Sequence, residues 1–267
     1  MAAKLQIFFY SRNFFGVFFL FLHFFLYFCS QIQQSMQKNI LLLLPFILLA
    51  CTHHPTKVEI MRQQKAIQDS ITYCNAKQNV IYSDSILHAL IPQTDTLMQS
   101  FVYSKDEKAE DHGHYVHKLL QTTRNAERNF IQAYVMDNYT VRLQSYYYGS
   151  QKHEQSAVRF SFGEDYVEKE GSNHSFNAEG WHEILTIEGD DALQLLSLID
   201  NHVNERILVT SIGKQNIRYY LSENERKALR QTYLLAVAMR NINTLERAID
   251  VSNRQIEKYE KKHAKAK

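Results

Sequence analysis

The spacing of hydrophobic residues changes from one segment of the chain to the next. Apolar residues recur at helical intervals over residues 57–90, alternate with polar residues over about 115–221, and return to helical intervals over 222–259. A period of 3.6 residues places apolar side chains on one face of a helix, and a period of 2 places them on one face of a strand. The pattern predicts an α+β protein: an antiparallel β-sheet domain with one covering helix, flanked by long N- and C-terminal helices.

The first long helix is predicted from Lys57 to about Leu90, a stretch without glycine or proline that Pro92 closes. Its most regular apolar or small positions recur every seven residues, at Ile60, Ile67, Cys74 and Ile81. The companion positions of this heptad are mostly polar. A seven-residue interval keeps side chains on one stripe of a helix. We expect this stripe to be the seam against a second helix, because so weak a seam does not hold a helix alone.

The last helix is predicted to begin at a capping box formed by Ser222 and Glu225 and to run to about Tyr259 without glycine or proline. Its seam follows alternating three- and four-residue steps, at Leu235, Ala238, Ile242, Leu245, Ile249, Ser252, Ile256 and Tyr259. Because the two helices have similar lengths, we expect them to pair as an antiparallel coiled-coil stalk. The alternative is that both lie flat on the central domain.

Alternating runs between these helices predict three β-hairpins, one further strand and one short helix. The hairpins join Phe130–Met136 to Tyr139–Tyr148, Ala157–Phe162 to Tyr166–Lys169, and Ile207–Ile212 to Gln215–Leu221. The further strand is Trp181–Ile187, and the helix follows Gly189, with Asp190 or Asp191 as its expected N-cap and Leu193, Leu196, Ile199 and Val203 on one face. Consecutive hairpins predict one antiparallel sheet with the short helix on one face.

Two apolar runs precede these elements. The first, over residues 14–28, is shorter than the roughly 20 residues that a membrane-spanning helix needs. The second, over residues 36–50, has a basic start, a short apolar core and a small residue before Cys51, which are the parts of a signal peptide. We interpret residues 1–35 as an upstream extension that precedes the true translation start at Met36. The alternative is that they form a second membrane segment.

The residues Leu48-Leu49-Ala50-Cys51 resemble the lipobox of bacterial lipoproteins. The resemblance implies that Cys51 receives a diacylglycerol on its thiol, becomes the N-terminus by cleavage, and is then acylated on its amino group. The implied partner is the lipid bilayer, with no cofactor besides these covalent lipids. Thr52 follows Cys51 and no acid occurs before Glu59. By the same resemblance, this favours a periplasm-facing protein of the cell envelope, on the outer membrane rather than the inner one.

These features divide the chain into five segments. They are the upstream extension (1–35), the lipoprotein signal peptide (36–50), a tether with the first long helix (51–101), the β-rich domain (102–221) and the last helix with its basic tail (222–267). The layout, a β module between helical ends, is similar to that of uncharacterised envelope lipoproteins. The similarity also rests on the runs His114-Tyr115-Val116-His117-Lys118 and Tyr146-Tyr147-Tyr148-Gly149. That similarity implies no activity.

The charge balance of the chain changes when the first 50 residues are excluded. They hold 11 of the 16 Phe, three of the 30 basic residues and none of the 28 acids, so the chain from Cys51 onward has 27 basic and 28 acidic residues. This balance, without a basic stripe, argues against nucleic acid as a partner. Three cysteines are too few for a disulfide scaffold. We expect Cys74 to be buried on the helix seam, and a homodimer joined through Cys74 is the alternative.

Two clusters of side chains are candidate ligand sites. The candidate metal ligands are His112, His114 and His117, beside Asp111. On a strand the first two share one face, but the spacing is loose for a zinc site, which needs four ligands. The candidate ligand-binding aromatics are Tyr146, Tyr148 and Trp181. Exposed rings on a sheet stack on a sugar or anchor a protein partner, whereas buried rings only pack.

The sequence contains no nucleophile elbow, P-loop, Rossmann glycine pattern, His-Glu-x-x-His or Cys-x-x-Cys. The run Trp181-His182-Glu183 offers an acid/base pair only if a cleft surrounds it. We therefore expect no catalytic residue and predict a membrane-anchored envelope lipoprotein with a structural or partner-binding role. Binding of a glycan or a metal is the alternative, and an envelope hydrolase ranks third.

Overall fold

The computed structural model describes residues 56–105, 113–121, 127–202 and 204–264. The predicted signal peptide and lipobox, with Cys51, lie outside the described residues, as do His112 and Val203. The chain divides into two compact units, residues 1–68 and residues 69–267. In the first unit the described residues are 56–68, nearly all of them helical. The β domain lies in the second unit.

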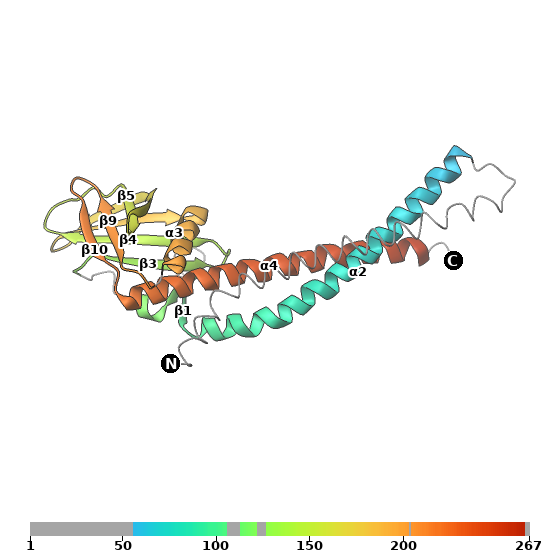
Figure 1. Ribbon diagram of the computed structural model, residues 1–267, viewed down its shortest axis with the longest axis horizontal. Helices are drawn as coiled ribbons and strands as arrows, with labels where there is room; N and C mark the ends of the chain where they lie inside the picture. The colour runs from blue at the N-terminus through green and yellow to red at the C-terminus, as the bar shows by residue number, and fades with distance from the viewer. Residues whose placement is uncertain (1–55, 106–112, 122–126, 203, 265–267) are drawn as a thin grey trace. The chain divides into compact units, whose positions relative to one another are not determined.

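The protein is α+β, as predicted, and its strands form two antiparallel sheets (Figure 1). The larger sheet has the order β1 (Phe101–Ser104), β2 (His114–His117), β3 (Phe130–Met136), β4 (Val141–Gly149), β8 (Trp181–Glu188), β7 (Ser172–Asn177). The smaller sheet has the order β10 (Ile217–Tyr220), β9 (Ile207–Ile212), β5 (Ala157–Phe162), β6 (Asp165–Glu170). The helices are α2 (Lys57–Met98), α3 (Gly189–Asn201) and α4 (Glu223–Ala264), with a 3-10 turn, η1 (Lys118–Leu120). In the described part of the chain, no helix is both long and apolar enough to cross a membrane.

The three predicted hairpins are confirmed as the antiparallel pairs β3–β4, β5–β6 and β9–β10. They divide between two sheets instead of forming one, because β5 pairs with β9 and closes the smaller sheet apart from β4. The strands β1, β2 and β7 were not predicted. The sequence of β7 is almost entirely polar, so hydrophobic alternation does not reveal it.

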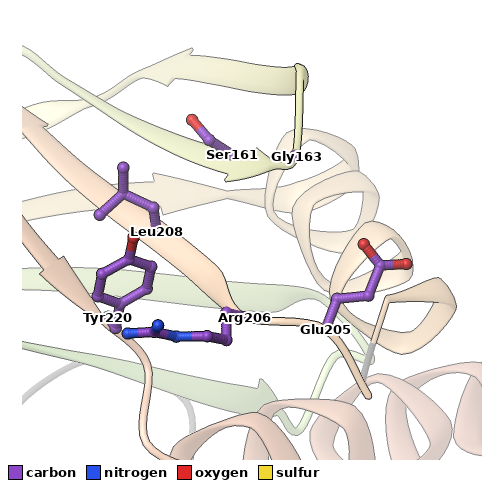
Figure 2. A pocket seen from close by; sticks show the side chains of 6 residues that line it. All are labelled: Ser161, Gly163, Glu205, Arg206, Leu208 and Tyr220. Atoms are coloured by element: carbon purple, nitrogen blue, oxygen red, sulfur yellow. The ribbon is translucent and has the colours of Figure 1, made fainter.

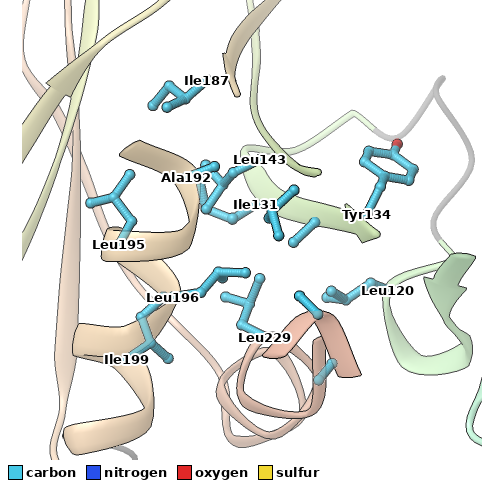
Figure 3. Packing of buried hydrophobic residues seen from close by; sticks show 14 of the residues in the cluster. Leu120, Ile131, Tyr134, Leu143, Ile187, Ala192, Leu195, Leu196, Ile199 and Leu229 are labelled. Carbon is cyan, nitrogen blue, oxygen red and sulfur yellow. The ribbon is translucent and has the colours of Figure 1, made fainter. Parts of the chain in front are cut away.

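The hydrophobic core lies where α3 and the first half of α4 cover one face of the larger sheet. Ile131 of β3 and Leu143 of β4 have no exposed surface, and neither do Leu196 of α3 and Leu229 of α4. Figure 3 shows these side chains gathered between the sheet and the two helices. Phe160 of the smaller sheet belongs to the same cluster. Both sheets therefore share one core.

The predicted start of α4 is confirmed and that of α3 is not. The Oε2 atom of Glu225 accepts hydrogen bonds from the backbone N–H (2.8 Å) and the hydroxyl (2.7 Å) of Ser222, which in turn accepts the backbone N–H of Glu225 (3.2 Å). This is the predicted capping box. The N-cap of α3 is Glu188, so the expectation for Asp190 or Asp191 was wrong. Both acids lie in the first turn, where the helix dipole favours negative charge.

Within the second unit, α2 and α4 pack together in the predicted antiparallel orientation. The rings of Tyr73 and Tyr259 stack with their centroids 4.4 Å apart, and the Tyr73 hydroxyl donates to Glu260 (3.0 Å). Lys262 forms an ion pair with Asp69. These contacts join the N-terminal part of one helix to the C-terminal part of the other. We call residues 69–98 and 241–264 the helix pair.

The seam predicted for α4 is confirmed, because all eight of its residues are buried or half-buried. The seam predicted for α2 is wrong. Ile60 and Ile67 in the first unit are exposed, as are Cys74 and Ile81 in the second, Ile81 to 71%. The buried or half-buried positions that repeat at three- and four-residue steps are Asp69, Tyr73, Ala76, Val80, Ser83, Leu87, Leu90, Thr94 and Leu97. Asp69, Ala76, Ser83 and Thr94 interrupt this stripe with small or polar residues, whereas the exposed stripe has isoleucine at three of its four positions.

Candidate functional site

A buried carboxylate lies at the centre of the polar groups of the β domain. Glu183 projects from β8 and has no exposed surface. Its oxygens accept hydrogen bonds from the backbone N–H groups of His153 (2.6 Å), Glu154 (2.8 Å) and Gln155 (2.7 Å) and from the side-chain amide of Asn173 (2.9 Å). Burial by itself raises the pKa of Glu183, but these hydrogen bonds outweigh it and hold the pKa below its usual value. Glu183 therefore stays ionised in the interior.

A histidine and a serine form a hydrogen-bonded pair beside this carboxylate. The Nε2 atom of His153 lies 2.8 Å from the hydroxyl of Ser211 on β9. His153 is 3% exposed and Ser211 is 2% exposed. Burial lowers the pKa of His153, although the charge of Glu183 and the contact with Ser211 oppose that shift. The imidazole is therefore neutral near pH 7.

The arrangement differs from a catalytic triad. In a triad the carboxylate accepts a hydrogen bond from the second ring nitrogen of the histidine. Glu183 instead accepts the backbone N–H of His153, and the hydroxyl of Ser211 is closed off from solvent. Together with the hydrogen bond from the Tyr147 hydroxyl to the carbonyl of Gln151 (2.8 Å), these contacts hold the segment between β4 and β5 against both sheets. Their geometry is that of a structural network.

Of the residues in this network, the sequence indicates Glu183 but not His153 or Ser211. The run containing Glu183 was noted as an acid/base candidate, and the register of β8 places Glu183 beside Tyr147. Nothing in the sequence distinguishes His153 or Ser211, which lie 58 residues apart and meet only through the pairing of β5 with β9. Residues that meet only because their strands pair have no characteristic spacing in the sequence, so a motif search does not find them.

The structure does not bring together the two predicted metal ligands that it describes, His114 and His117. His114 and His117 lie three residues apart on β2 and therefore face opposite sides of the sheet. The ring of His117 is buried and lies 2.5 Å from the side chain of Gln231, while His114 lies edge-on to Tyr134. Within the described ranges, no three His, Cys, Asp or Glu side chains are placed to share a metal ion. A role for His112 stays a prediction, since that residue lies outside them.

The predicted aromatic set is divided between two faces of the larger sheet. Tyr146 and Tyr148 lie on one face and Trp181 on the other, as the register of β4 and β8 requires. Tyr146 is buried and stacks on Phe130 at 4.2 Å, so it packs in place. Trp181 is half-buried, with the ammonium group of Lys152 5.7 Å from its ring centroid.

Tyr148 belongs to an aromatic row that the sequence did not reveal. Its ring lies 4.9 Å from that of His182, which stacks on Phe176 at 4.9 Å with an interplanar angle of 5°. Tyr148 and Phe176 are half-buried and His182 is nearly covered. Phe176 comes from β7, the strand that was not predicted, so no sequence spacing connects it with Tyr148.

The structure describes Cys74 but not Cys51. Cys51, the predicted site of lipid attachment, lies outside the described residues. Cys74 is an exposed free thiol on α2. The expectation that Cys74 is buried on the seam was wrong, because the true seam of α2 runs through Tyr73 and Ala76 instead. An exposed thiol has no packing role.

A shallow depression opens on the outward side of the smaller sheet (Figure 2). Its volume is about 440 Å³, and it is lined by Ser161, Gly163, Glu205, Arg206, Leu208 and Tyr220. The guanidinium of Arg206 lies over the ring of Tyr220, 4.2 Å from its centroid, and Tyr220 is 53% exposed. Tyrosine and arginine are residue types enriched in the hot spots of protein interfaces. Sequence reasoning missed this place, because no pattern connects the turn before β9 with β5.

The chain matches no protein-family model, no curated protein and no solved structure. The geometry of its own residues is therefore the ground for a function. That geometry consists of a closed polar network, an aromatic row on the larger sheet, an open depression on the smaller sheet and an antiparallel pair of long helices.

Proposed function

We propose that the chain is a non-catalytic, lipid-anchored protein of the bacterial cell envelope that holds a partner-binding β domain on a helical stalk. The observation that supports this most directly is the antiparallel contact of α2 with α4 at Tyr73 and Tyr259. This contact lies at the end of the helix pair from which the chain leads back toward Cys51. The β domain begins at the opposite end, with β1.

The length of α2 gives the stalk its reach. From Asp69 to Met98 the helix rises about 45 Å at 1.5 Å per residue. Asp69 begins this length of helix, and β1 follows its other end at Phe101. A rigid spacer of this length suits a domain that must meet a partner away from the membrane surface.

The groups in the domain support binding over catalysis. The hydroxyl of Ser211 and the imidazole of His153 are closed to substrate, and Glu183 is fully used by four hydrogen bonds. On the surface, an aromatic ring and a guanidinium lie together at Tyr220 and Arg206. Tyrosine and arginine are the residue types enriched where proteins bind one another. A protein partner is therefore the first choice.

Membrane fractionation tests the anchor. Cys51→Ser is expected to remove both incorporation of labelled palmitate and recovery of the protein with the membrane, because a serine hydroxyl does not accept the lipid. Cys74→Ser, which changes an exposed thiol on α2, is the matched control and is expected to retain both. A Cys51→Ser protein that stays in the membrane fraction without label would contradict the lipid anchor.

A glycan ligand is the alternative, and the row formed by Tyr148, His182 and Phe176 favours it, because planar rings stack on sugars. Cosedimentation with purified insoluble peptidoglycan tests it. Wild-type protein is expected to sediment with the polymer, Tyr148→Ala to lose binding about tenfold, and Tyr166→Ala on the smaller sheet to bind normally. If wild-type protein stays in the supernatant, the glycan alternative is wrong.

A further inference from the structure

We infer that the outward face of the smaller sheet is a self-complementary interface for a second copy of this chain. The register of the sheet defines this face. Tyr220, Leu208, Ser161 and Tyr166 lie in one row across β10, β9, β5 and β6. Arg218, Thr210, Arg159 and Glu168 form the next row. Their neighbours along each strand, such as Phe160 and Val209, point into the core.

The face has a basic side and an acidic side. On the β10 side, Arg218 is exposed and Arg206 lies over Tyr220, while the neighbouring acid Glu205 is bound by His202. On the β6 side, Glu168 and Glu170 project outward, one of them bound by Arg159 at 2.6 Å. Among the described residues, neither Arg206 nor Arg218 forms an ion pair, and Glu170 forms none either. Each side therefore offers charge that the chain itself does not neutralise.

Each side also presents one exposed tyrosine under an arginine. Tyr220 is 53% exposed with Arg206 at 4.2 Å, and Tyr166 is 59% exposed with the guanidinium of Arg159 at 4.5 Å from its ring. Tyr220, Leu208 and Ser161 line the depression of Figure 2, and Tyr166 is the register partner of Ser161 on β6. Exposed tyrosine and arginine around a recess are the residues that anchor protein interfaces.

Charge decides how two such faces meet. A two-fold axis parallel to the strands places β10 of one copy over β6 of the other, so that Arg218 faces Glu168 and Tyr220 faces Tyr166. A two-fold axis across the strands places β10 over β10, so that arginine faces arginine. Opposite charges favour the first arrangement and like charges disfavour the second. Either two-fold axis gives an isologous contact, which closes a dimer because both copies use the same patch.

The size of the face predicts a weak dimer. Four strands spaced about 4.8 Å apart, with about six residues at about 3.3 Å each, cover roughly 19 by 20 Å. That is about 380 Å² per copy, below the size of specific stable interfaces and in the range of weak, transient contacts. We therefore expect a dissociation constant on the order of 10 µM, and two sheets packed face to face with nearly aligned strands.

Charge reversal with rescue tests the interface. Sedimentation velocity of the full chain in excess detergent micelles, in a Cys74→Ser background, measures the dissociation constant. Arg218→Glu and Glu168→Arg change the two positions that face each other across the strand-parallel axis. Each is expected to weaken the dimer about tenfold or more, and the double variant is expected to recover most of the loss. Arg254→Glu, on the exposed side of α4, is the matched control and is expected to change nothing. A protein that is monomeric at all concentrations, or a double variant as weak as its parents, would overturn the inference.

Crosslinking tests the orientation in the same background. With a short bismaleimide, the double variant Tyr166→Cys/Tyr220→Cys is expected to give covalent dimers in the native membrane. Tyr220→Cys alone is expected to give none, because the strand-parallel axis keeps the two copies of residue 220 on opposite sides of the interface. Crosslinked Tyr220→Cys dimers would instead show the axis across the strands and contradict the charge argument.

Discussion

α4 packs against the β domain along its first half and against α2 along its second half, and the two halves bury different residues. In the first half, Ala228, Leu229 and Leu235 have no exposed surface. In the second half, Ser252 is the residue that is buried, and the rest of the seam is half-exposed. Stabilisation follows the apolar area removed from water. We therefore expect the domain to contribute most of the free energy of unfolding and the helix pair to open first.

Leu229→Ala is expected to have the largest effect. Removing three buried heavy atoms from the core leaves a cavity and lowers the free energy of unfolding by about 3 kcal/mol. Denaturant unfolding followed by the fluorescence of Trp181, the one tryptophan of the chain, measures this loss in the domain itself. Leu87→Ala, on the seam of α2, is the control and is expected to change this signal by less than half as much. Equal losses would contradict the division between domain and helix pair.

Glu183→Gln is expected to cost about 2 kcal/mol at pH 7, because a neutral amide accepts the surrounding N–H groups less strongly than a carboxylate. The pKa of Glu183 is lowered in the folded protein. Its ionised form therefore adds stability above the unfolded pKa of about 4.3, and this contribution is lost as pH falls through the folded pKa.

Urea unfolding of wild type and Glu183→Gln at pH 7 and at pH values below about 4 tests this dependence. The gap between the two proteins is expected to narrow in acid. Glu164→Gln, in the exposed turn between β5 and β6, is the control and is expected to follow wild type at every pH. A gap of constant size would show that Glu183 acts through shape and not through charge.

Tyr259→Ala is expected to act on the helix pair alone. It removes the stack on Tyr73 and the hydroxyl contact with Ser70 (3.2 Å), which together are worth about 1 kcal/mol. Hydrogen exchange is expected to speed up in the last turns of α4, while amides of the domain keep their protection. Lys258→Ala, on the exposed side of the same turn, is the control. Faster exchange in β3 or β4 would mean that the pair and the domain unfold as one unit.

The contrast between the two halves of α4 also explains which parts of the fold the sequence predicts. Where a helix or strand faces the core, as at Leu235 or Leu143, burial selects apolar residues and the period is visible. Where helices meet outside the core, Ala76, Ser83 and Thr94 interrupt the apolar period of the α2 seam and make it hard to recognise. The capping box at Ser222 was predictable because its signal is local.

The candidate sites follow the same rule. The opposite facing of Tyr146 and Tyr147 was predictable from strand alternation. The contacts of His153 with Ser211 and of Tyr148 with Phe176 were not, because they depend on which strands become neighbours. Arg206 and Ser161 line one depression for the same reason. Local periodicity says which way a side chain points, and topology decides what it meets.

Ile81→Ser gives the smallest expected effect and the sharpest test of the seam. Ile81 belongs to the stripe that recurs every seven residues along α2, but its side chain is 71% exposed. Replacing it is therefore expected to change the free energy of unfolding by less than about 0.5 kcal/mol. Leu87→Ser is the matched variant, since Leu87 is 8% exposed and faces the seam. It is expected to lower the thermal midpoint of the helical signal measurably, because a hydroxyl replaces a buried apolar side chain. If Ile81→Ser lowers that midpoint as much as Leu87→Ser, the heptad of isoleucines is covered in solution and α2 has a second partner on that stripe.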